Sequence, residues 1–359
     1  MRVAGIMSGT SLDGIDVAIV DLRGSKVSSL AFRSTPYSRA TREAILAVSN
    51  AETQTWAISR LNFLLGELYA KAVLETCRAA RVPLKSIDLI GLHGQTIFHE
   101  SGVSTMQIGE SAVVAERTGI RVVSNFRERD IAAGGQGAPL VPYVDYLLFR
   151  HRRIGRVALN IGGIANITVI SAGAKPEQVI AFDTGPGNMV IDALASVKTV
   201  GRQRYDKDGR IAQSGTIQPW LLAALLSHPY FAQKPPKSAG REQFGREYVS
   251  RLLATRLPLA DLIATATELT ARSIARAIPE GMHELIVSGG GVHNRHLMNR
   301  LRVLLSSMKV VTSSAHGVDP DAKEAIAFAI LAREHVRGRP ANLPSATGAR
   351  RAVVLGKMS

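Results

Sequence analysis

The chain opens with two short apolar runs, at residues 3–7 and 17–20, on either side of a polar stretch at residues 8–14. Apolar runs of this length that flank a turn-forming segment are typical of the two strands of a β-hairpin. The polar stretch holds two glycines and the hydroxyl side chains of Ser8, Thr10 and Ser11. Backbone N–H groups and hydroxyls in such a turn are suited to hold a phosphate in a concave site. Taken alone, the stretch is explained equally well as an ordinary hairpin with a polar turn.

Apolar spacing predicts alternating helices and strands along the rest of the chain. Residues 57–80 carry apolar side chains at helical spacing, and Pro83 ends that helix. Further helices are predicted at residues 141–149, 189–195, 259–277, 295–305 and 321–335. Strands are predicted at residues 87–92, 121–124, 157–161, 165–170, 179–182, 284–288, 310–312 and 352–355. The alternation indicates an α/β protein.

Polar or glycine-rich segments follow several predicted strands, at residues 93–96, 125–139, 183–188 and 289–294. Ligands of open α/β sheets bind at the carboxyl ends of strands, so these segments are candidate binding loops. Residues 157–170 form a second strand, glycine turn and strand, which resembles the opening hairpin but is too short to prove a duplication. Residues 200–245 are polar and contain Gly and Pro, and we expect a mobile insertion with short helices there.

Composition limits the class of protein. The 359 residues suffice for two domains, and 46% of them are hydrophobic. Cys77 is the only cysteine, which excludes an internal disulfide and favours a reducing compartment. No secretory signal is visible at the N-terminus. Residues 157–174 carry no charge, but Gly and Asn interrupt them, which suits a strand-turn-strand unit rather than a membrane helix.

The chain is strongly basic, with a formal net charge of +15 and a pI of about 10.3. The arginines are scattered, and no dense basic run with interleaved aromatic residues occurs. Nucleic-acid binding is therefore a weak interpretation. A basic surface can instead keep the protein soluble or attract an acidic substrate.

Three carboxylates stand out as candidates for chemistry. Asp13 and Asp16 lie in or next to the opening turn and could hold Mg²⁺, directly or through water. Asp183 sits at a predicted strand end before a glycine-proline turn, where it is either a catalytic residue or the N-cap of the next helix. A carboxylate with an ordinary pKa is ionised at neutral pH and can accept a proton without tuning.

Seven motifs occur in a fixed order along the chain: GTSLDGID at 9–16, HGQT at 93–96, NFRERDIAAGGQGAPLVP at 125–142, LNIGGIAN at 159–166, FDTGPGN at 182–188, SGGGVHN at 288–294 and EAIAFA at 324–329. Together they resemble the 1,6-anhydro-N-acetylmuramic acid kinase family, over nearly the full chain. The wider resemblance is to the superfamily of acetate and sugar kinases, actin and heat-shock chaperone ATPases.

The resemblance implies an α/β fold of two related domains, each a mixed β-sheet flanked by helices, with a nucleotide cleft between them. Domain I is expected at residues 1–150, completed by residues 338–359, and domain II at residues 151–337. The cleft is expected to narrow around ATP, with hinges near residues 149–155 and after His335.

The resemblance also assigns site residues. ATP contacts fall on Gly9, Thr10, Ser11, Leu12, Asp13, Gly14, Ile15 and Asp16, on Gly162 and Gly163, and on Gly289, Gly290, Gly291 and Asn294. Sugar contacts fall on Thr96, Arg129, Asp130 and Gly185, and Mg²⁺ falls to Asp13.

Several of these assignments have a structural alternative. Asn294 is as well explained as a helix N-cap. Arg129, expected to bind the lactyl carboxylate of a muramic acid, is equally well explained by a surface ion pair. Glu324 is implied to lie beside the sugar and the attacking water, but its position in the first turn of a helix also suits the helix dipole.

The function implied is that of an ATP- and Mg²⁺-dependent phosphotransferase acting on an alcohol group. Water attacks C1 of the anhydro sugar while Asp183 takes its proton, and O6 then attacks the γ-phosphate of ATP. The products are N-acetylmuramic acid 6-phosphate and ADP. The resemblance implies a homodimer in the bacterial cytoplasm that recycles cell-wall sugar, with no nucleic-acid or membrane partner. Two alternatives remain: an actin- or chaperone-like ATPase that acts on a protein partner, and a kinase for another amino sugar.

Overall fold

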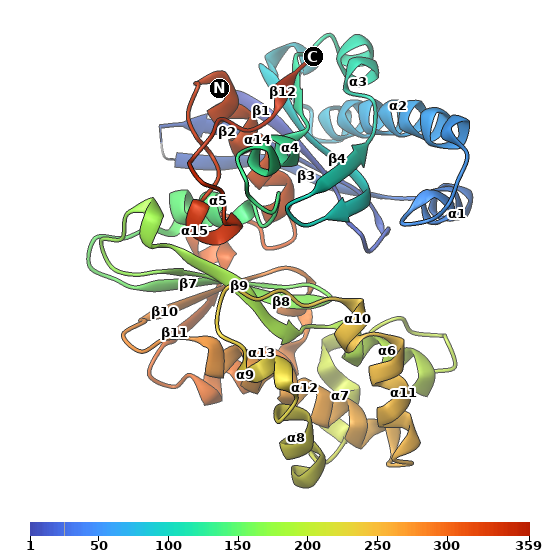
Figure 1. Ribbon diagram of the computed structural model, residues 1–359, viewed down its shortest axis with the longest axis vertical. Helices are drawn as coiled ribbons and strands as arrows, with labels where there is room; N and C mark the ends of the chain where they lie inside the picture. The colour runs from blue at the N-terminus through green and yellow to red at the C-terminus, as the bar shows by residue number, and fades with distance from the viewer. Residues whose placement is uncertain (25) are drawn as a thin grey trace. The chain divides into compact units, whose positions relative to one another are not determined.

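The computed structural model describes residues 1–24 and 26–359, and the chain separates into two compact units (Figure 1). Unit 1 consists of Met1–Leu148 and Gly317–Ser359, and unit 2 of Phe149–His316. Each unit has its own mixed sheet and its own helices. The predicted fold class, an α/β protein with two mixed sheets flanked by helices, is confirmed.

The sheet of unit 1 runs in the order β12-β6-β4-β1-β2-β3, with β5 paired to β4. Strands β1, β2 and β3 are antiparallel neighbours, whereas β1 pairs with β4, and β4 with β6, in parallel. The strands are β1 (Arg2–Ser8), β2 (Gly14–Arg23), β3 (Lys26–Pro36), β4 (Leu89–Glu100), β5 (Ser104–Ile108), β6 (Val122–Ser124) and β12 (Lys357–Met358). Apolar side chains of β1, β2 and β4 form one core with α1 and α2.

The helices of unit 1 are α1 (Arg39–Val48), α2 (Thr55–Ala79), α3 (Ser111–Thr118), α4 (Phe126–Ala132), α5 (Val141–Phe149), α14 (Lys323–Val336) and α15 (Pro344–Thr347), with a 3₁₀ turn at Leu84–Ser86. Glycines let α14 lie directly on the sheet, because a Cβ at Gly5 would overlap the Ala325 carbonyl and one at Gly91 would overlap the Phe328 carbonyl.

Because of this close packing, one boundary between the units differs from the expected one. The first boundary lies near the expected residue 150, but the second lies at Gly317 rather than at residue 338. Helix α14, expected in domain II, packs against β1, β2 and β4 and is therefore part of unit 1. The chain therefore passes from unit 2 back to unit 1 before α14, and not after His335 as expected.

The sheet of unit 2 runs in the order β11-β10-β7-β8-β9, with β9 at one edge. Its strands are β7 (Arg156–Ile161), β8 (Ile164–Ile170), β9 (Ile180–Pro186), β10 (Glu284–Ser288) and β11 (Lys309–Thr312). Its helices are α6 (Met189–Lys198), α7 (Arg210–Ser214), α8 (Pro219–Leu226), α9 (Pro229–Ala232), α10 (Arg241–Phe244), α11 (Arg246–Ala254), α12 (Leu259–Ala277) and α13 (Arg295–Leu304). Shorter 3₁₀ turns lie at Pro176–Gln178, Lys207–Gly209, Gly290–His293 and Ser313–His316.

Three predicted elements differ from the structure. The strand predicted at 87–92 continues to Glu100, so the HGQT motif lies inside β4 and pairs with β5. The strand predicted at 179–182 continues to Pro186, so Asp183 lies inside β9 and not at its end. Residues 352–355 form no strand, and the last strand is β12.

The short helices predicted between residues 200 and 245 are present. They pack with α6, α11 and α12 around a core of their own, whose largest members include Tyr230, Phe244 and Tyr248. The insertion is thus a packed subdomain of unit 2, built around an aromatic cluster.

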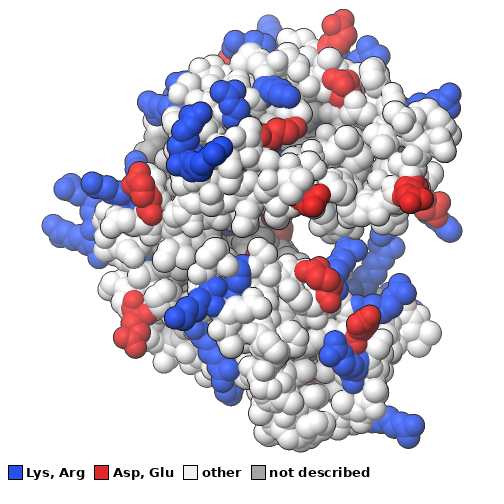
Figure 2. All heavy atoms as spheres, viewed as in Figure 1, with Lys and Arg blue, Asp and Glu red and all other residues white. Residues whose placement is uncertain are grey.

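On the face seen in Figure 2, Lys and Arg are spread among Asp and Glu and do not form one continuous basic patch. Across residues 1–24 and 26–359, none of the helices combines the length and the apolar character that a bilayer span requires.

Candidate active site

The opening turn of unit 1 joins β1 to β2 as predicted, but its side chains divide into two groups. Thr10, Ser11 and Asp13 are exposed, whereas the Leu12 and Ile15 side chains are buried in the core. Leu12 has a φ of 58°, and its N–H donates to the Gly9 carbonyl at 3.2 Å. A ligand could therefore meet Leu12 and Ile15 only through their backbone.

Two other residues of this hairpin serve the fold. Ser8 is buried; its hydroxyl lies 2.7 Å from the Tyr69 hydroxyl and donates to the Gly94 carbonyl at 3.0 Å. The prediction that this hydroxyl is available to a phosphate is therefore wrong. A Cβ at Gly14 would overlap the Thr35 carbonyl, which explains the glycine by strand packing alone.

Carboxylates gather beside this turn. Burial raises the pKa of Asp16, and the nearby charges of Asp321 and Asp13 raise it further, while a hydrogen bond with Ser34 lowers it. In the described part of the chain, no three His, Cys, Asp or Glu side chains are arranged to hold a metal. Mg²⁺ usually takes one or two protein carboxylates, with phosphates and water completing the shell, so Asp13 and Asp16 alone fit that ion.

Glu324 lies in the first turn of α14, in the same unit as this carboxylate group. Burial raises the pKa of Glu324; the charges of Lys323 and Arg127 oppose this, and those of Asp16 and Asp145 add to it. Lys323 is itself buried in an ion pair with Asp145 at 2.9 Å. Glu324 has no ion pair among the described residues, so its carboxylate is available for a ligand.

Arg127, which sequence analysis missed, lies nearby. Its Nε and Nη2 face the His93 Nε2 at 3.2 and 2.9 Å, and its Nη1 donates to the Gly137 carbonyl at 3.0 Å. Burial and the Arg127 charge lower the pKa of His93 to about 3, so a neutral imidazole accepts these bonds. Burial lowers the pKa of Arg127 to about 10, and the guanidinium remains charged at neutral pH. No carboxylate within residues 1–24 and 26–359 forms an ion pair with it.

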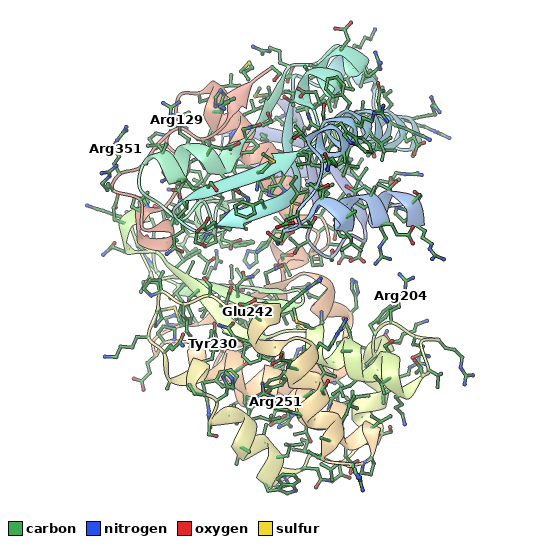
Figure 3. All side chains as sticks on the ribbon, turned by 45° about the vertical axis from the view of Figure 1, so that its right-hand side comes forward. Arg129, Arg204, Tyr230, Glu242, Arg251 and Arg351 are labelled. Carbon is green, nitrogen blue, oxygen red and sulfur yellow. The ribbon has the colours of Figure 1, made fainter. Side chains whose placement is uncertain are left out.

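The two residues predicted to bind sugar on α4 take other roles. Arg129 is exposed, at the outside of the ribbon in Figure 3. Asp130 is fully buried, and its carboxylate accepts from the Asn342 amide at 2.6 Å, the Thr347 hydroxyl at 2.8 Å and the Gly137 N–H at 2.8 Å. We therefore withdraw Asp130 as a sugar ligand, because its oxygens hold the glycine-rich turn and the C-terminal segment together.

Thr96 is half-buried on β4, and its hydroxyl accepts a bond from the Gln107 amide of β5 at 3.1 Å. Gly185 of unit 2, the fourth predicted sugar contact, has a φ of 139°, and a Cβ there would lie 2.8 Å from the Phe231 ring. Packing against Phe231 thus accounts for the glycine at position 185. The Thr96 hydroxyl accepts one bond and can still donate another.

Asp183 of unit 2 is a partly buried carboxylate on the edge strand β9. Its N–H donates to the Lys237 carbonyl at 3.1 Å, its Oδ2 accepts from the Ala239 N–H at 2.8 Å, and its carbonyl accepts from the Tyr230 hydroxyl at 2.6 Å. Burial raises the pKa of Asp183 to about 6; the Ala239 N–H lowers it and the Glu242 charge raises it. The N-cap of α6 is Asn188, so the alternative role of Asp183 as a helix cap is excluded.

The second glycine turn, Gly162 and Gly163, joins β7 to β8. A Cβ at either position would make only ordinary contacts, the nearest at 3.6 and 3.5 Å, so packing does not require glycine there. The Gly163 carbonyl accepts from the Gly187 N–H at 2.9 Å, which ties this turn to the end of β9. The turn therefore presents an open backbone surface.

The three glycines after β10 are not equivalent. A Cβ at Gly289 would lie 2.7 Å from the Asn160 amide oxygen, and one at Gly291 would overlap Ile161. A Cβ at Gly290 would meet nothing closer than 4.0 Å. The Asn294 side chain caps α13, accepting from the Leu297 N–H at 3.0 Å. The role of helix N-cap thus explains the Asn294 side chain. Gly290, in contrast, borders open space.

Comparison with known proteins identifies the family of the chain. A family model described as anhydro-N-acetylmuramic acid kinase matches residues 1–359. An anhydro-N-acetylmuramic acid kinase of Caldanaerobacter subterraneus is 46% identical, over 99% of this chain and 96% of that protein. One of Bacillus cereus is 45% identical, over 100% of this chain and 99% of that protein. Component A of the Acidaminococcus fermentans (R)-2-hydroxyglutaryl-CoA dehydratase, a solved structure, aligns with a TM-score of 0.48 and 13% identity, over 94% of this chain and 99% of that one.

Proposed function

The chain belongs to the anhydro-N-acetylmuramic acid kinase family, and from this premise we propose that it opens the 1,6-anhydro bridge with water and phosphorylates O6 with ATP. The observation that carries the proposal is the Asp183 carboxylate. It is partly buried, it has one oxygen without a hydrogen-bond partner among the described residues, and its pKa is raised to about 6. Such a group is mostly ionised at neutral pH and is a stronger base than an ordinary aspartate.

The proposed reaction balances as follows. The oxygen of water forms a bond to C1, and its proton passes to Asp183. The C1–O6 bond breaks and its electron pair stays on O6. O6 then forms a bond to the γ-phosphorus, and the bond to the bridging oxygen breaks to release ADP. The proton on Asp183 leaves to solvent before the next turnover.

We assign the phosphates of ATP to backbone N–H groups at two turns, Gly9–Gly14 of unit 1 and Gly162–Gly163 of unit 2. Gly290 borders the adenosine, where a side chain would enter the ligand's space without striking protein. Asp13 and Asp16, supported by Asp321, would hold Mg²⁺, which neutralises charge on the transferring phosphoryl group when bound.

We assign the lactyl carboxylate of the sugar to Arg127 in place of Arg129. A buried guanidinium without a carboxylate partner is costly unless an anion binds it. His93 and Gly137 fix the guanidinium in place, and the charges of Glu324, Glu128 and Asp130 act on it without forming an ion pair. An anionic substrate group would supply that direct pair, and Arg is suited to bind a carboxylate with two parallel hydrogen bonds. Glu324 is assigned to the same sugar.

Phosphate transfer from ATP across a panel of anhydro and reducing amino sugars tests the proposal. We expect a product 6-phosphate from the anhydro-muramic sugar, and ¹⁸O from labelled water at C1 but not in the phosphate. ATP hydrolysis that is independent of any sugar would support a nucleotide-driven ATPase instead. Efficient transfer to another amino sugar, with none to the anhydro-muramic sugar, would reassign the substrate.

We further propose that the enzyme acts as a homodimer in the bacterial cytoplasm, on a small amino sugar. The relatives reported above are bacterial, and the single cysteine, Cys77, is free and buried, which suits a reducing compartment. Sedimentation equilibrium tests the dimer, because a monomer at micromolar concentration would contradict it.

A further inference from the structure

The insertion at residues 200–245 contacts Asp183 more closely than any other part of unit 2 outside the sheet. Resting on the proposed function of Asp183 as the base, we infer that Tyr230 and the 237–239 segment are positioning residues that present one oxygen of this carboxylate, Oδ1, to the attacking water. The inference gives the insertion a role in the chemistry, although none of its side chains is placed on the substrate.

The first contact is between backbones. Strand β9 is an edge strand, so the N–H of Asp183 would otherwise lack a partner on its open side. The Lys237 carbonyl accepts that N–H at 3.1 Å, and two residues later the Ala239 N–H donates to Oδ2 at 2.8 Å. The 237–239 segment thus fixes both the main chain and one carboxylate oxygen of Asp183.

The second contact comes from Tyr230 on α9. Its hydroxyl donates to the Asp183 carbonyl at 2.6 Å, and only 1% of the residue is exposed. The Tyr230 ring packs edge-on against Phe231 and Phe244, and the Lys237 ammonium lies 4.7 Å from the ring centroid. Because the ring is held on these sides, its hydroxyl is a rigid support for the backbone that carries the base.

Together these contacts distinguish the two carboxylate oxygens. Oδ2 is committed to the Ala239 N–H, whereas Oδ1 has no hydrogen-bond partner in the part of the chain that the structure describes. A proton from water therefore goes to Oδ1. A 180° flip of the carboxylate only exchanges two equivalent oxygens, so one oxygen accepts from the Ala239 N–H and the other remains open in either orientation.

The insertion also supplies the charge nearest to this carboxylate. Glu242 on α10 raises the pKa of Asp183, in addition to the larger effect of burial. The other polar groups next to Asp183 are the Tyr230 hydroxyl, the Lys237 carbonyl and Asn166, its partner on β8, whereas the Lys237 ammonium lies over the Tyr230 ring. Tyr230 and Glu242 are both labelled in Figure 3, within the insertion.

The first test removes one hydroxyl. In Tyr230→Phe we expect kcat to fall about tenfold while KM for ATP stays within twofold, since a misplaced base slows the chemical step. Tyr248→Phe is the matched control, because the Tyr248 hydroxyl is buried in the same aromatic cluster and has no partner among the described residues. Equal kcat values for both variants would overturn the role of Tyr230.

The second test changes the pH profile, which a purely structural residue would not move. Glu242→Gln removes a negative charge, so the pKa of Asp183 should fall and the acid limb of kcat/KM should move to lower pH. Because Glu242 is exposed, we expect a shift of about 0.3 pH unit that disappears at about 1 M salt. Glu247→Gln, also exposed but on α11, is the control and should leave the profile unchanged.

Asp183→Asn separates this inference from the proposed function. Near-normal turnover by Asp183→Asn would show that Asp183 is not the base, and the proposed function would then fail together with this inference. Loss of turnover in Asp183→Asn, combined with wild-type profiles in Tyr230→Phe and Glu242→Gln, leaves the base in place and refutes the role of the insertion. If Tyr230→Phe does not fold, the surface variant Glu242→Gln still decides the question.

Discussion

The ionisation of Asp183 gives the sharpest prediction for the proposed mechanism. With a pKa of about 6, roughly 90% of the carboxylate is ionised at pH 7 and roughly 10% at pH 5. If the ionised form is the base, kcat/KM for the sugar at saturating ATP should fall about tenfold between these pH values. An aspartate with an ordinary pKa would remain ionised throughout this range, and the rate would stay flat.

The assay is the initial rate of ADP release at pH 4.5 to 8, at fixed ionic strength. ATP binding, measured separately over the same range, is the control, since ATP phosphates also titrate. In Asp183→Asn, turnover should fall at least about a hundredfold at pH 7, the usual contribution of a general base. A flat wild-type profile down to pH 4.5, or an Asp183→Asn variant within tenfold of the wild type, would refute the reasoning.

Stability provides an independent check on the same carboxylate. A raised pKa means that the folded chain holds the Asp183 proton more tightly than the unfolded chain does. Folding therefore loses stability through this group as pH rises from about 4 to about 6, and the loss persists above pH 6. Asp183→Asn removes the penalty, so it should melt at the same temperature as the wild type at pH 4, and no lower than the wild type at pH 7.

Three further predictions test other parts of the site. Gly290→Val should raise KM for ATP more than tenfold without lowering the melting temperature, because its side chain enters open space, and equal losses for both substrates would indicate a structural turn. Arg127→Lys should raise KM for the anhydro sugar at least about tenfold, because lysine cannot form the bidentate contact. Arg129→Lys is the control and should leave this KM unchanged; equal effects of the two variants would contradict the assignment. Asp130→Ala should destabilise the protein by about 3 kcal/mol in chemical unfolding, because it leaves three buried donors without an acceptor, and a loss below about 1 kcal/mol would contradict the role of Asp130.

Elements defined by local pattern were predictable from the sequence. The predicted helix at 259–277 and the predicted strand at 284–288 match α12 and β10, since apolar periodicity over one segment decides each of them. The extents of β4 and β9 were not predictable from the segments themselves. HGQT and DTGP contain turn-forming residues, and pairing of Gln95 and Thr96 with β5, and of Asp183, Gly185 and Pro186 with β8, continues each strand through them. The second boundary between the units was missed for the same reason, because α14 belongs with β1 and β4 through contacts distant in sequence.

The candidate site shows a similar division. Asp183 and Asp16 became candidates as acidic residues in or beside polar, glycine-containing turns, and Glu324 became one through the family resemblance; all three remain predictions. Arg127 was missed and Arg129 chosen, because consecutive positions on α4 face different surroundings and sequence alone does not show which face is covered. The contacts of Asp183 with Tyr230, Lys237 and Ala239 span about fifty residues and give no local signal.

Once the contacts are known, the buried charges divide into those with an ion pair and those without one. Asp145, Glu268, Glu284 and Glu334 are buried, and each has a cation within ion-pair distance, so each charge is compensated within its own unit. Asp183, Glu324 and Arg127 have perturbed pKa values and no ion pair among the described residues. Burial of a charge without an ion-pair partner costs stability, and a ligand group of opposite charge offsets that cost when it binds. Asp130 also has no ion pair, but three neutral donors of the protein already occupy its carboxylate oxygens, so hydrogen bonding and not charge pairing gives it a structural role.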